Sequence, residues 1–344
     1  MTLGTDTVEF RLPADRSATS PPEARGLARD EVRLMVCDAG TVTHARFREL
    51  GSYLRPGDLV VVNNSAMLSA ALDVTVRGAA AVLHFSTWLD DGRWVVEVRD
   101  PRGTPWGGQA LESDVRVALP DGHAAVLREP WLPGGTRLWV AEVDTEVRAL
   151  LAAYGRPITY SYVPQRWSAS YYRTVFGIEP GSAEMPSAGR PFTAALVTEL
   201  VAGGVGLAPI TLHTGVSSPE TGEPPSPERF AVPEMTAGLV NATHAAGGRV
   251  VAVGTTVTRA LESATAATGL VRARAGWTDL VLDGDRPARA VDGLITGWHA
   301  PGASHLHLLE SVAGAEVVRE AYAAALDSGY LWHEFGDTAL LFRR

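Results

Sequence analysis

The chain has 344 residues, of which 46% are hydrophobic and 20% are charged, and this composition is typical of a globular protein with two domains or with one domain and an insertion. All 30 basic residues are arginines, which excludes Schiff-base chemistry and a Walker A site because both need lysine; the single Cys37 excludes an internal disulfide and a cysteine-rich metal site. The net charge of −9 argues against broad nonspecific binding of nucleic acid but allows a local arginine patch.

The N-terminal region has no basic segment followed by an apolar run, so no secretion signal is predicted. The longest uncharged run, residues 200–219, contains Pro209 and several glycines and predicts a helix end and a strand, not a membrane span. We therefore expect a cytoplasmic protein with no membrane partner and no disulfide-linked partner. Apolar runs at 32–37 and 59–64 predict short buried strands, and Cys37 is expected in the core.

Short alternating apolar runs follow one another between about residues 70 and 143, without a helical pattern. Turn signals at 90–92 and 120–122 join two pairs of these runs as hairpins. The pattern predicts five or six antiparallel strands that form a small barrel. We expect this barrel domain at residues 69–144, inserted into a discontinuous α/β domain of residues 1–68 and 145–344.

From residue 145 onward, helical and strand patterns alternate, which predicts a mixed or parallel sheet covered by helices. Helices are expected at 145–155, 192–204, 233–248, from 256 to about 267, 304–314 and 316–326. Strands are expected at 205–213, 249–256, 279–284, 290–296 and 339–343. Residues 214–229, rich in Pro, Ser and Gly, join a strand to a helix and form either a mobile flap over a ligand or a plain surface linker.

Two strand ends carry the best candidates for chemistry. The turn Gly254-Thr255-Thr256 opens a helix whose first N–H groups favour a carboxylate or a phosphate, although either threonine is equally suited to be an ordinary N-cap. His213 ends an apolar strand beside the predicted cleft. It is either a general base or a hydrogen-bonded interior histidine.

Weaker candidates have both a structural and a functional interpretation. Ser187 and Gly189 lie in a loop that leads into a helix, where the serine is able to cap and the glycine gives access to the backbone. Asp292 and Asp337 are turn formers or substrate carboxylates. The remaining candidates are core or surface residues on the first interpretation and base or phosphate contacts on the second: Tyr171, Tyr172, Arg173, Arg272, Arg274, Arg286 and Arg289.

Several motifs together resemble the S-adenosylmethionine:tRNA ribosyltransferase-isomerase family of the queuosine pathway. The similarity runs almost from end to end. It includes ARDEVRLMV, GDLVVVNNSAML, YRTVFGIEPGSAEMPSAGRPFT, ITLHTG, GGRVVAVGTTVTRALES, VDGLITGWHAPGASHL and YLWHEFGDTALL. Each motif alone is weak, and the set is specific.

The resemblance implies an α/β domain with an inserted β-barrel. It also implies transfer of the ribosyl part of S-adenosylmethionine to a 7-aminomethyl-7-deazaguanine at the tRNA wobble position, with isomerisation of the sugar and release of adenine and methionine. The sulfonium acidifies the hydrogens of the adjoining 5′ carbon, so a positioned base can start the rearrangement, and no metal is needed. S-adenosylmethionine is then a substrate and tRNA a possible partner.

The chain departs from the family pattern around the expected pocket. The family N-D-T-R is Asn63-Asn64-Ser65-Ala66 here, and Arg190-Pro191 stand where the family has Leu-His. The segment at 214–219 and the segment at 160–163 are altered. The M-H-x-E-x-Y motif keeps Glu228 and loses its histidine. Lost hydrogen-bonding groups weaken recognition of the old substrate, so these changes indicate retained nucleoside binding with a changed acceptor or changed chemistry.

We therefore expect His213 to act as acid and base, Glu228 to lie near the sulfonium or the sugar, and Arg259 to complete the catalytic set. The substrate-binding positions that the resemblance implies are Asn63, Asn64, Ser187, Ala188, Gly189, Thr211, Gly215, Gly254, Thr255, Thr256 and Asp292. Two alternatives stay open: a divergent enzyme that uses S-adenosylmethionine or a related nucleoside with a small-molecule acceptor, and a non-catalytic binder of tRNA or nucleoside.

Overall fold

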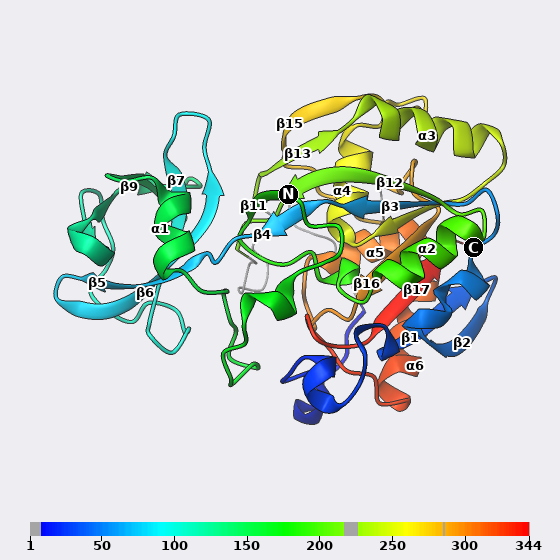
Figure 1. The fold of residues 1–344 in the computed structure, drawn as a ribbon, viewed down its shortest axis with the longest axis horizontal. Coiled ribbons are helices and arrows are strands. Elements are labelled where there is room, and N and C mark those ends of the chain that lie inside the picture. Colours follow the sequence, from blue (N-terminus) through cyan, green and yellow to red (C-terminus); the bar gives the residue numbers. More distant parts are fainter. Residues whose placement is uncertain (1–7, 217–225, 285, 344) are drawn as a thin grey trace.

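The computed structural model describes residues 8–216, 226–284 and 286–343. Two lobes are evident in Figure 1: a small barrel, and a larger layered part in which helices cover a twisted sheet. No helix in the described ranges is both long and apolar enough to cross a membrane.

A nine-stranded mixed sheet forms the larger lobe. Strands β12, β3, β14 and β16 run parallel to one another, whereas β13 is antiparallel to β12 and β17 is antiparallel to β16 and parallel to β1. The fold class predicted from the sequence is confirmed. In spatial order the strands are β15 (Arg274–Thr278), β13 (Glu228–Val232), β12 (Gly206–His213), β3 (Leu59–Asn63), β14 (Val250–Val253), β16 (Gly293–Gly297), β17 (Thr338–Phe342), β1 (Arg33–Asp38) and β2 (Thr41–Arg46).

Both faces of the central strands are buried, because alternate side chains of a strand enter two different hydrophobic clusters. Leu59 and Val61 of β3 belong to one cluster, and Val60 and Val62 belong to the other. The first cluster also contains side chains of α3 (Glu234–Ala245), α4 (Thr255–Ser263), α5 (His305–Ala313) and α6 (Ala315–Asp327). The second contains those of α2 (Ala194–Ala202) and the 3₁₀ helix Phe47–Tyr53.

The smaller lobe is a closed barrel of six antiparallel strands, as the hairpin pattern predicts. Helix α1 (Val147–Tyr154) follows it and contributes Val147, Leu150 and Leu151 to the barrel's hydrophobic cluster. The strands are β5 (Ala71–Val76), β6 (Ala79–Trp88), β7 (Trp94–Arg99), β8 (Arg116–Ala118), β9 (Ala124–Pro130) and β10 (Leu138–Val143). A two-stranded ribbon pairs β4 (Ser65–Met67) with β11 (Glu179–Ser182). Strand β4 directly follows β3 in the chain, and the ribbon lies between the barrel and the larger lobe in Figure 1.

A charged network is buried among the barrel strands. Glu97 is 2% exposed and lies 2.9 Å from Arg99, 3.1 Å from Arg137 and 3.4 Å from His84. Burial raises the pKa of this carboxyl, but hydrogen bonds from His84 and Arg99 and the charges of both arginines outweigh that effect and lower it to about 2. The carboxylate therefore stays ionised inside the barrel.

Three predictions about elements are wrong. No strand forms at 279–284, and the edge strand is instead β15 at Arg274–Thr278. Most of its residues are exposed, so it has no hydrophobic pattern, and its pairing with β13 fixes it in the sheet. Helix α4 ends at Ser263, before the expected end near 267, because residues 264–272 turn back through the bridge between Thr265 and Val271. The segment 214–229 leads into strand β13 and not directly into a helix.

Part of that segment, residues 217–225, lies outside the described residues, so the choice between flap and linker stays open. Cys37 lies in β1 with 5% of its surface exposed, as expected. Burial raises the pKa of its thiol to about 12.

Candidate active site

The candidate residues gather where the parallel strands end. Asn63 ends β3, His213 ends β12, and Gly254 follows the last residue of β14. Because these three strands are neighbours in the sheet, their carboxyl ends form one edge. From the sequence, the ligand is expected at this edge.

His213 is held by two serines. Its Nδ1 lies 2.8 Å from Ser65 Oγ, which lies 2.6 Å from Ser182 Oγ. Ser182 Oγ in turn accepts the backbone N–H of Thr214 at 3.0 Å. Burial, with the positive charges of Arg229 and Arg148, lowers the pKa of His213 to about 4. The ring is therefore neutral at pH 7 and oriented by its hydrogen bond with Ser65.

A glycine makes room for this ring. A Cβ atom on Gly181 would lie 2.5 Å from His213 Nδ1, closer than any carbon approaches in a relaxed structure. The motif that carries Gly181 and Ser182 thus supplies both the space and the hydrogen bond for the histidine.

Glu228 and Arg259 form a buried ion pair, with 2.6 Å between Glu228 Oε2 and a guanidinium nitrogen. Glu228 Oε1 accepts the backbone N–H of Gly215 at 3.3 Å, beside His213 in sequence. Burial raises the pKa of Glu228, opposed by the charge of Arg259 and by both hydrogen bonds. Arg259 also donates to three backbone carbonyls, those of Ser226, Thr278 and Leu280. Because these donors bond Glu228 and the backbone, we infer that Arg259 holds Glu228 in position.

The turn before α4 has no side-chain cap. Gly254 is the N-cap residue, at φ +93°, and no side chain accepts the first N–H groups of the helix there. The expectation that Thr255 or Thr256 is an ordinary N-cap is wrong, because both already lie inside the helix. A Cβ on Gly254 would lie 3.3 Å from that of Ala188, so this turn and the 187–189 segment are in contact.

Asn63, Asn64 and Thr211 bind other parts of the protein. Asn63 is 4% exposed; its amide oxygen accepts the N–H groups of Ser65 and Leu212, and its amide nitrogen donates to Leu212 O and, at 3.4 Å, to Thr256 Oγ1. Asn64 Oδ1 accepts the hydroxyl of Thr211 at 2.6 Å. These bonds tie β3 to β12 and α4 and thereby fix the geometry of the strand ends.

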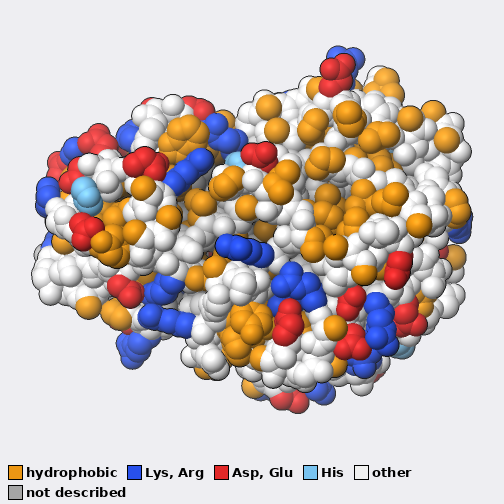
Figure 2. Space-filling model, in the orientation of Figure 1, with side chains coloured by type: hydrophobic (Ala, Val, Ile, Leu, Met, Phe, Trp, Pro, Cys, Tyr) orange, Lys and Arg blue, Asp and Glu red, His pale blue; other side chains and the backbone are white. Residues whose placement is uncertain are grey.

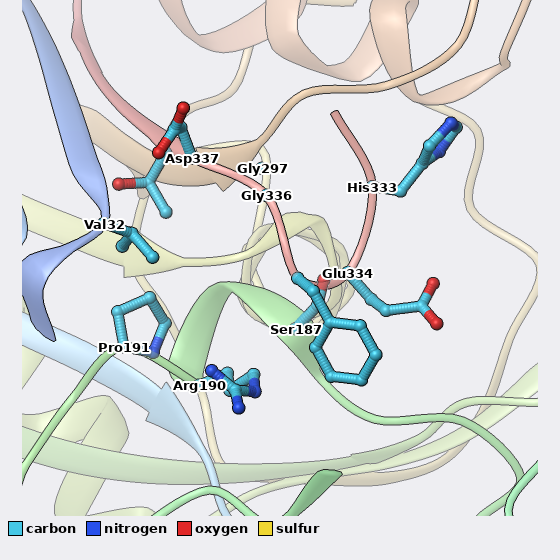
Figure 3. Close-up of a pocket in the computed structure, with 11 residues that line it drawn as sticks. Val32, Ser187, Arg190, Pro191, Gly297, His333, Glu334, Gly336 and Asp337 are labelled. Carbon is cyan, nitrogen blue, oxygen red and sulfur yellow. The ribbon is translucent and has the colours of Figure 1, made fainter. Parts of the chain in front are cut away.

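A small pocket opens beside the 187–189 turn. Figure 3 shows Ser187, Arg190 and Pro191 on one side and the loop that carries His333 and Asp337 on the other. Its volume is about 270 Å³, open solvent included. Arg190 is 2% exposed, and its guanidinium bonds Glu23 at 2.7 Å and Tyr171 O at 2.8 Å.

The structure does not bring Asp292 to this edge. Asp292 precedes β16 and accepts the N–H of Val250, the first residue of β14, so it lies at the amino ends of the strands. Its carboxylate also contacts His244 at 2.9 Å.

Three of the weaker candidates make structural contacts. Asp337 accepts the N–H groups of Arg33 and Leu331, Tyr172 is buried against Phe335, and Arg274 donates to Ser263 O.

The sequence analysis missed a second acidic group near the pocket. Glu334 accepts the hydroxyl of Tyr162 at 2.5 Å, and the ring of Tyr162 stacks on that of His333 with 3.9 Å between centroids. Burial and the charge of Glu184 raise the pKa of Glu334 to about 7, although the hydrogen bond from Tyr162 opposes them. Ser65 and Ser182 were missed as partners of His213. Their motifs were visible, but their contact joins segments distant in sequence.

Comparison with known proteins places the chain in a family. Residues 5–341 match the model of a family described as queuosine biosynthesis protein. The chain is 32% identical to the S-adenosylmethionine:tRNA ribosyltransferase-isomerase of Moorella thermoacetica, over 97% of this chain and 98% of the relative, and 33% identical to that of Sphingopyxis alaskensis, over 98% and 97%. The crystal structure of an S-adenosylmethionine tRNA ribosyltransferase from Thermotoga maritima is similar, with a TM-score of 0.54 and 28% identity over 97% of this chain and 99% of that one. The chain therefore belongs to the queuosine biosynthesis protein family, as its motifs predict.

Proposed function

We propose that this protein is an S-adenosylmethionine:tRNA ribosyltransferase-isomerase. It transfers the ribosyl part of S-adenosylmethionine to the aminomethyl group of a 7-deazaguanine in the wobble position of tRNA, isomerises the sugar, and releases adenine and methionine. The observation that carries this proposal is the match to enzymes of that name over nearly the whole length of both chains. We also propose that the reaction takes place in the cytoplasm.

His213 is the proposed acid and base. The first step removes a proton from the 5′ carbon beside the sulfonium, and its acceptor has to be neutral before it takes the proton. Burial and two nearby arginines keep His213 neutral at pH 7, and Ser65 fixes the direction of its ring. The same imidazole can later return the proton.

Glu228 is the proposed electrostatic partner of the sulfonium or the sugar. Its carboxylate is buried and its position is set by Arg259 and by the N–H of Gly215. A fixed negative charge in a site that excludes water stabilises a cation more strongly than an exposed one does. Arg259 acts through Glu228, as a positioning residue.

The turn Gly254-Thr255-Thr256 is the proposed holder of the methionine carboxylate or the sugar oxygens. No side chain caps this helix, and the strand ends converge on it through the contact between Asn63 and Thr256. Ser187, Ala188 and Gly189 contact the nucleoside in this proposal, since their segment packs against Gly254.

Adenine release measured by chromatography tests the function. Purified protein is incubated with S-adenosylmethionine, alone and with an anticodon stem–loop that carries the aminomethyl-deazaguanine or guanine at the wobble position. Release that depends on the modified stem–loop is the expected result. Release without RNA would instead identify an enzyme with a small-molecule acceptor. Thermal stabilisation by S-adenosylmethionine without any product would identify a binder.

A further inference from the structure

Two arginine and three tryptophan side chains form one continuous row at the junction of the two lobes. The guanidinium groups of Arg148 and Arg229 lie 5.8 and 5.0 Å from the ring of Trp88, and that of Arg229 also lies 5.1 Å from Trp277. Trp277 is in ring contact with Trp131, with 6.3 Å between centroids. We call these five residues the arginine–tryptophan ladder.

The ladder joins elements from both lobes and begins beside the candidate active site. Trp88 ends barrel strand β6, whereas Arg229 and Trp277 lie on β13 and β15 of the sheet. In the pairing of β12 with β13, Arg229 stands directly opposite His213. The charges of Arg229 and Arg148 both act on the imidazole. A ligand on the ladder is therefore within reach of the reacting groups.

The ladder has the chemistry of a surface for unpaired bases. Guanidinium planes and indole faces stack on bases that have left a helix, and the positive charges attract the phosphates between them. Asp90 fixes Arg229 by an ion pair at 2.5 Å and accepts the indole N–H of Trp277 at 3.0 Å, so the row is preformed. Two arginines against one aspartate leave the row positive, as an acidic protein needs wherever it binds RNA.

Exposure distinguishes this row from a simple clamp between lobes. A clamp would bury its rings, but Trp88 is 41% exposed and Arg148 is exposed as well. Figure 2 shows basic side chains along the junction of the two lobes on the face in view. Arg229, Trp277 and Trp131 are half-buried, so the surface that the ladder offers to a ligand is that of Trp88 and Arg148.

We propose that the arginine–tryptophan ladder docks unpaired nucleotides of the tRNA anticodon loop that flank the modified base. This proposal rests on the proposed function, since it names the surface by which the same site receives its RNA. A base stacks on the exposed part of the Trp88 ring, and Arg148 and Arg229 contact the adjoining phosphates.

Fluorescence anisotropy with a labelled anticodon stem–loop measures this docking without requiring turnover. Trp88→Ala is expected to raise the Kd for the stem–loop about tenfold, and Trp88→Phe to retain most of the affinity because it keeps a stacking face. Arg148→Ala is expected to lower the slope of log Kd against log salt by about 0.7, the contribution of one phosphate contact in a single strand. Arg128→Ala, an exposed barrel arginine paired with Asp114 and Glu142, is the matched control and is expected to change neither quantity.

Steady-state kinetics separates docking from a structural role. The ladder variants are expected to raise KM for the stem–loop and to leave KM for S-adenosylmethionine and the thermal midpoint unchanged. Equal affinity of Trp88→Ala and wild type for the stem–loop would overturn the proposal, as would losses shared equally by both substrates. Wild-type protein that binds the stem–loop through the ladder but never releases adenine would refute the proposed function alone. Turnover that is indifferent to Trp88 and Arg148 would refute the docking alone.

Discussion

The imidazole of His213 owes its orientation to residues of two other segments. Ser65 follows β3, and Gly181 and Ser182 end β11, so three parts of the chain meet at one ring. Ser65 supplies a hydrogen bond to the ring, Gly181 leaves space for it, and Ser182 orients the hydroxyl of Ser65. Two predictions follow from this arrangement at the scale of single residues.

The pH profile of kcat/KM reports on His213. Its pKa is lowered to about 4 in the folded protein, so the base form is present above that value and is lost only as the pH falls through it. We expect the acidic limb assigned to this residue near pH 4 and not near 6.5. His213→Ala is expected to lower kcat about 10²- to 10⁴-fold and to remove that limb. Unchanged turnover in this variant would refute the assignment of His213 as acid and base.

Gly181→Ala is expected to inactivate the enzyme without unfolding it. The new Cβ would meet His213 Nδ1 at 2.5 Å, and the ring would have to leave its place beside Ser65. A displaced base costs on the order of 100-fold in kcat. The control is Gly238→Ala in α3, where a Cβ meets nothing within 4 Å and where alanine favours the helix by about 1 kcal/mol. Equal activity of both variants would show that the ring does not need this position.

At the scale of elements, sequence patterns predict the helices and strands in which buried and exposed side chains follow a regular period. Apolar periodicity indicates the barrel strands, the strand before Gly254 and most helices. Strand β15 does not, because its exposed residues are ordered only by their partner β13. Strand β13, which carries Glu228, follows a segment rich in Pro, Ser and Gly, and the sequence pattern predicts a loop there. Pairing between distant segments carries no local signal.

The candidate site divides in the same way. Residues at strand ends, such as His213 and Gly254, were predictable from motif and element together. Their partners Ser65 and Ser182 were not, because those contacts exist only in the folded chain. Asp292 was misplaced because a residue before a strand lies at the opposite edge from a residue after one.

The barrel network gives a prediction about acid stability. The pKa of Glu97 is about 2 when folded against an ordinary 4.5, so its contribution to stability is complete above about pH 4.5 and is lost as the pH falls from there toward 2. Glu97→Gln leaves Arg99 and Arg137 without this carboxylate in the interior and is expected to cost about 3–5 kcal/mol at pH 7. The variant should then lose less further stability than wild type between pH 4.5 and 2.

Thermal denaturation at a series of pH values checks the Glu97 prediction. Glu129→Gln, on an exposed barrel glutamate, is the matched control and should stay within about 0.5 kcal/mol of wild type. Parallel curves for Glu97→Gln and wild type below pH 4.5 would contradict the linkage argument.

At the scale of the whole molecule, the first strand β1 and the last strand β17 pair inside one sheet. Strand β17, near the C-terminus, lies between β16 and β1, and all five of its residues are buried. The barrel is joined to the same body next to the site, since Ser86 Oγ accepts the N–H of Val216, three residues after His213. Local stability at the catalytic edge thus depends on both lobes.

Deletion of residues 338–344 is expected to prevent folding. Without β17 the sheet is split between β16 and β1, and both new edges expose unpaired backbone groups. Size-exclusion chromatography and far-UV circular dichroism measure the outcome. Leu340→Ala is the graded form of the same test and should cost about 2–5 kcal/mol, whereas Val201→Ala on the exposed side of α2 should cost little. A deletion product that melts cooperatively would show that the remaining strands close without it.

Burial of Cys37 in β1, with its thiol pKa raised to about 12, has a practical consequence. Maleimide reagents react with thiolates, so Cys37 is expected to remain unlabelled at neutral pH. Because the chain has no other cysteine, two engineered ones, placed on the barrel and over α3, would carry a donor and an acceptor dye with no background. Energy transfer between the dyes would then report whether the distance between the lobes changes when RNA binds.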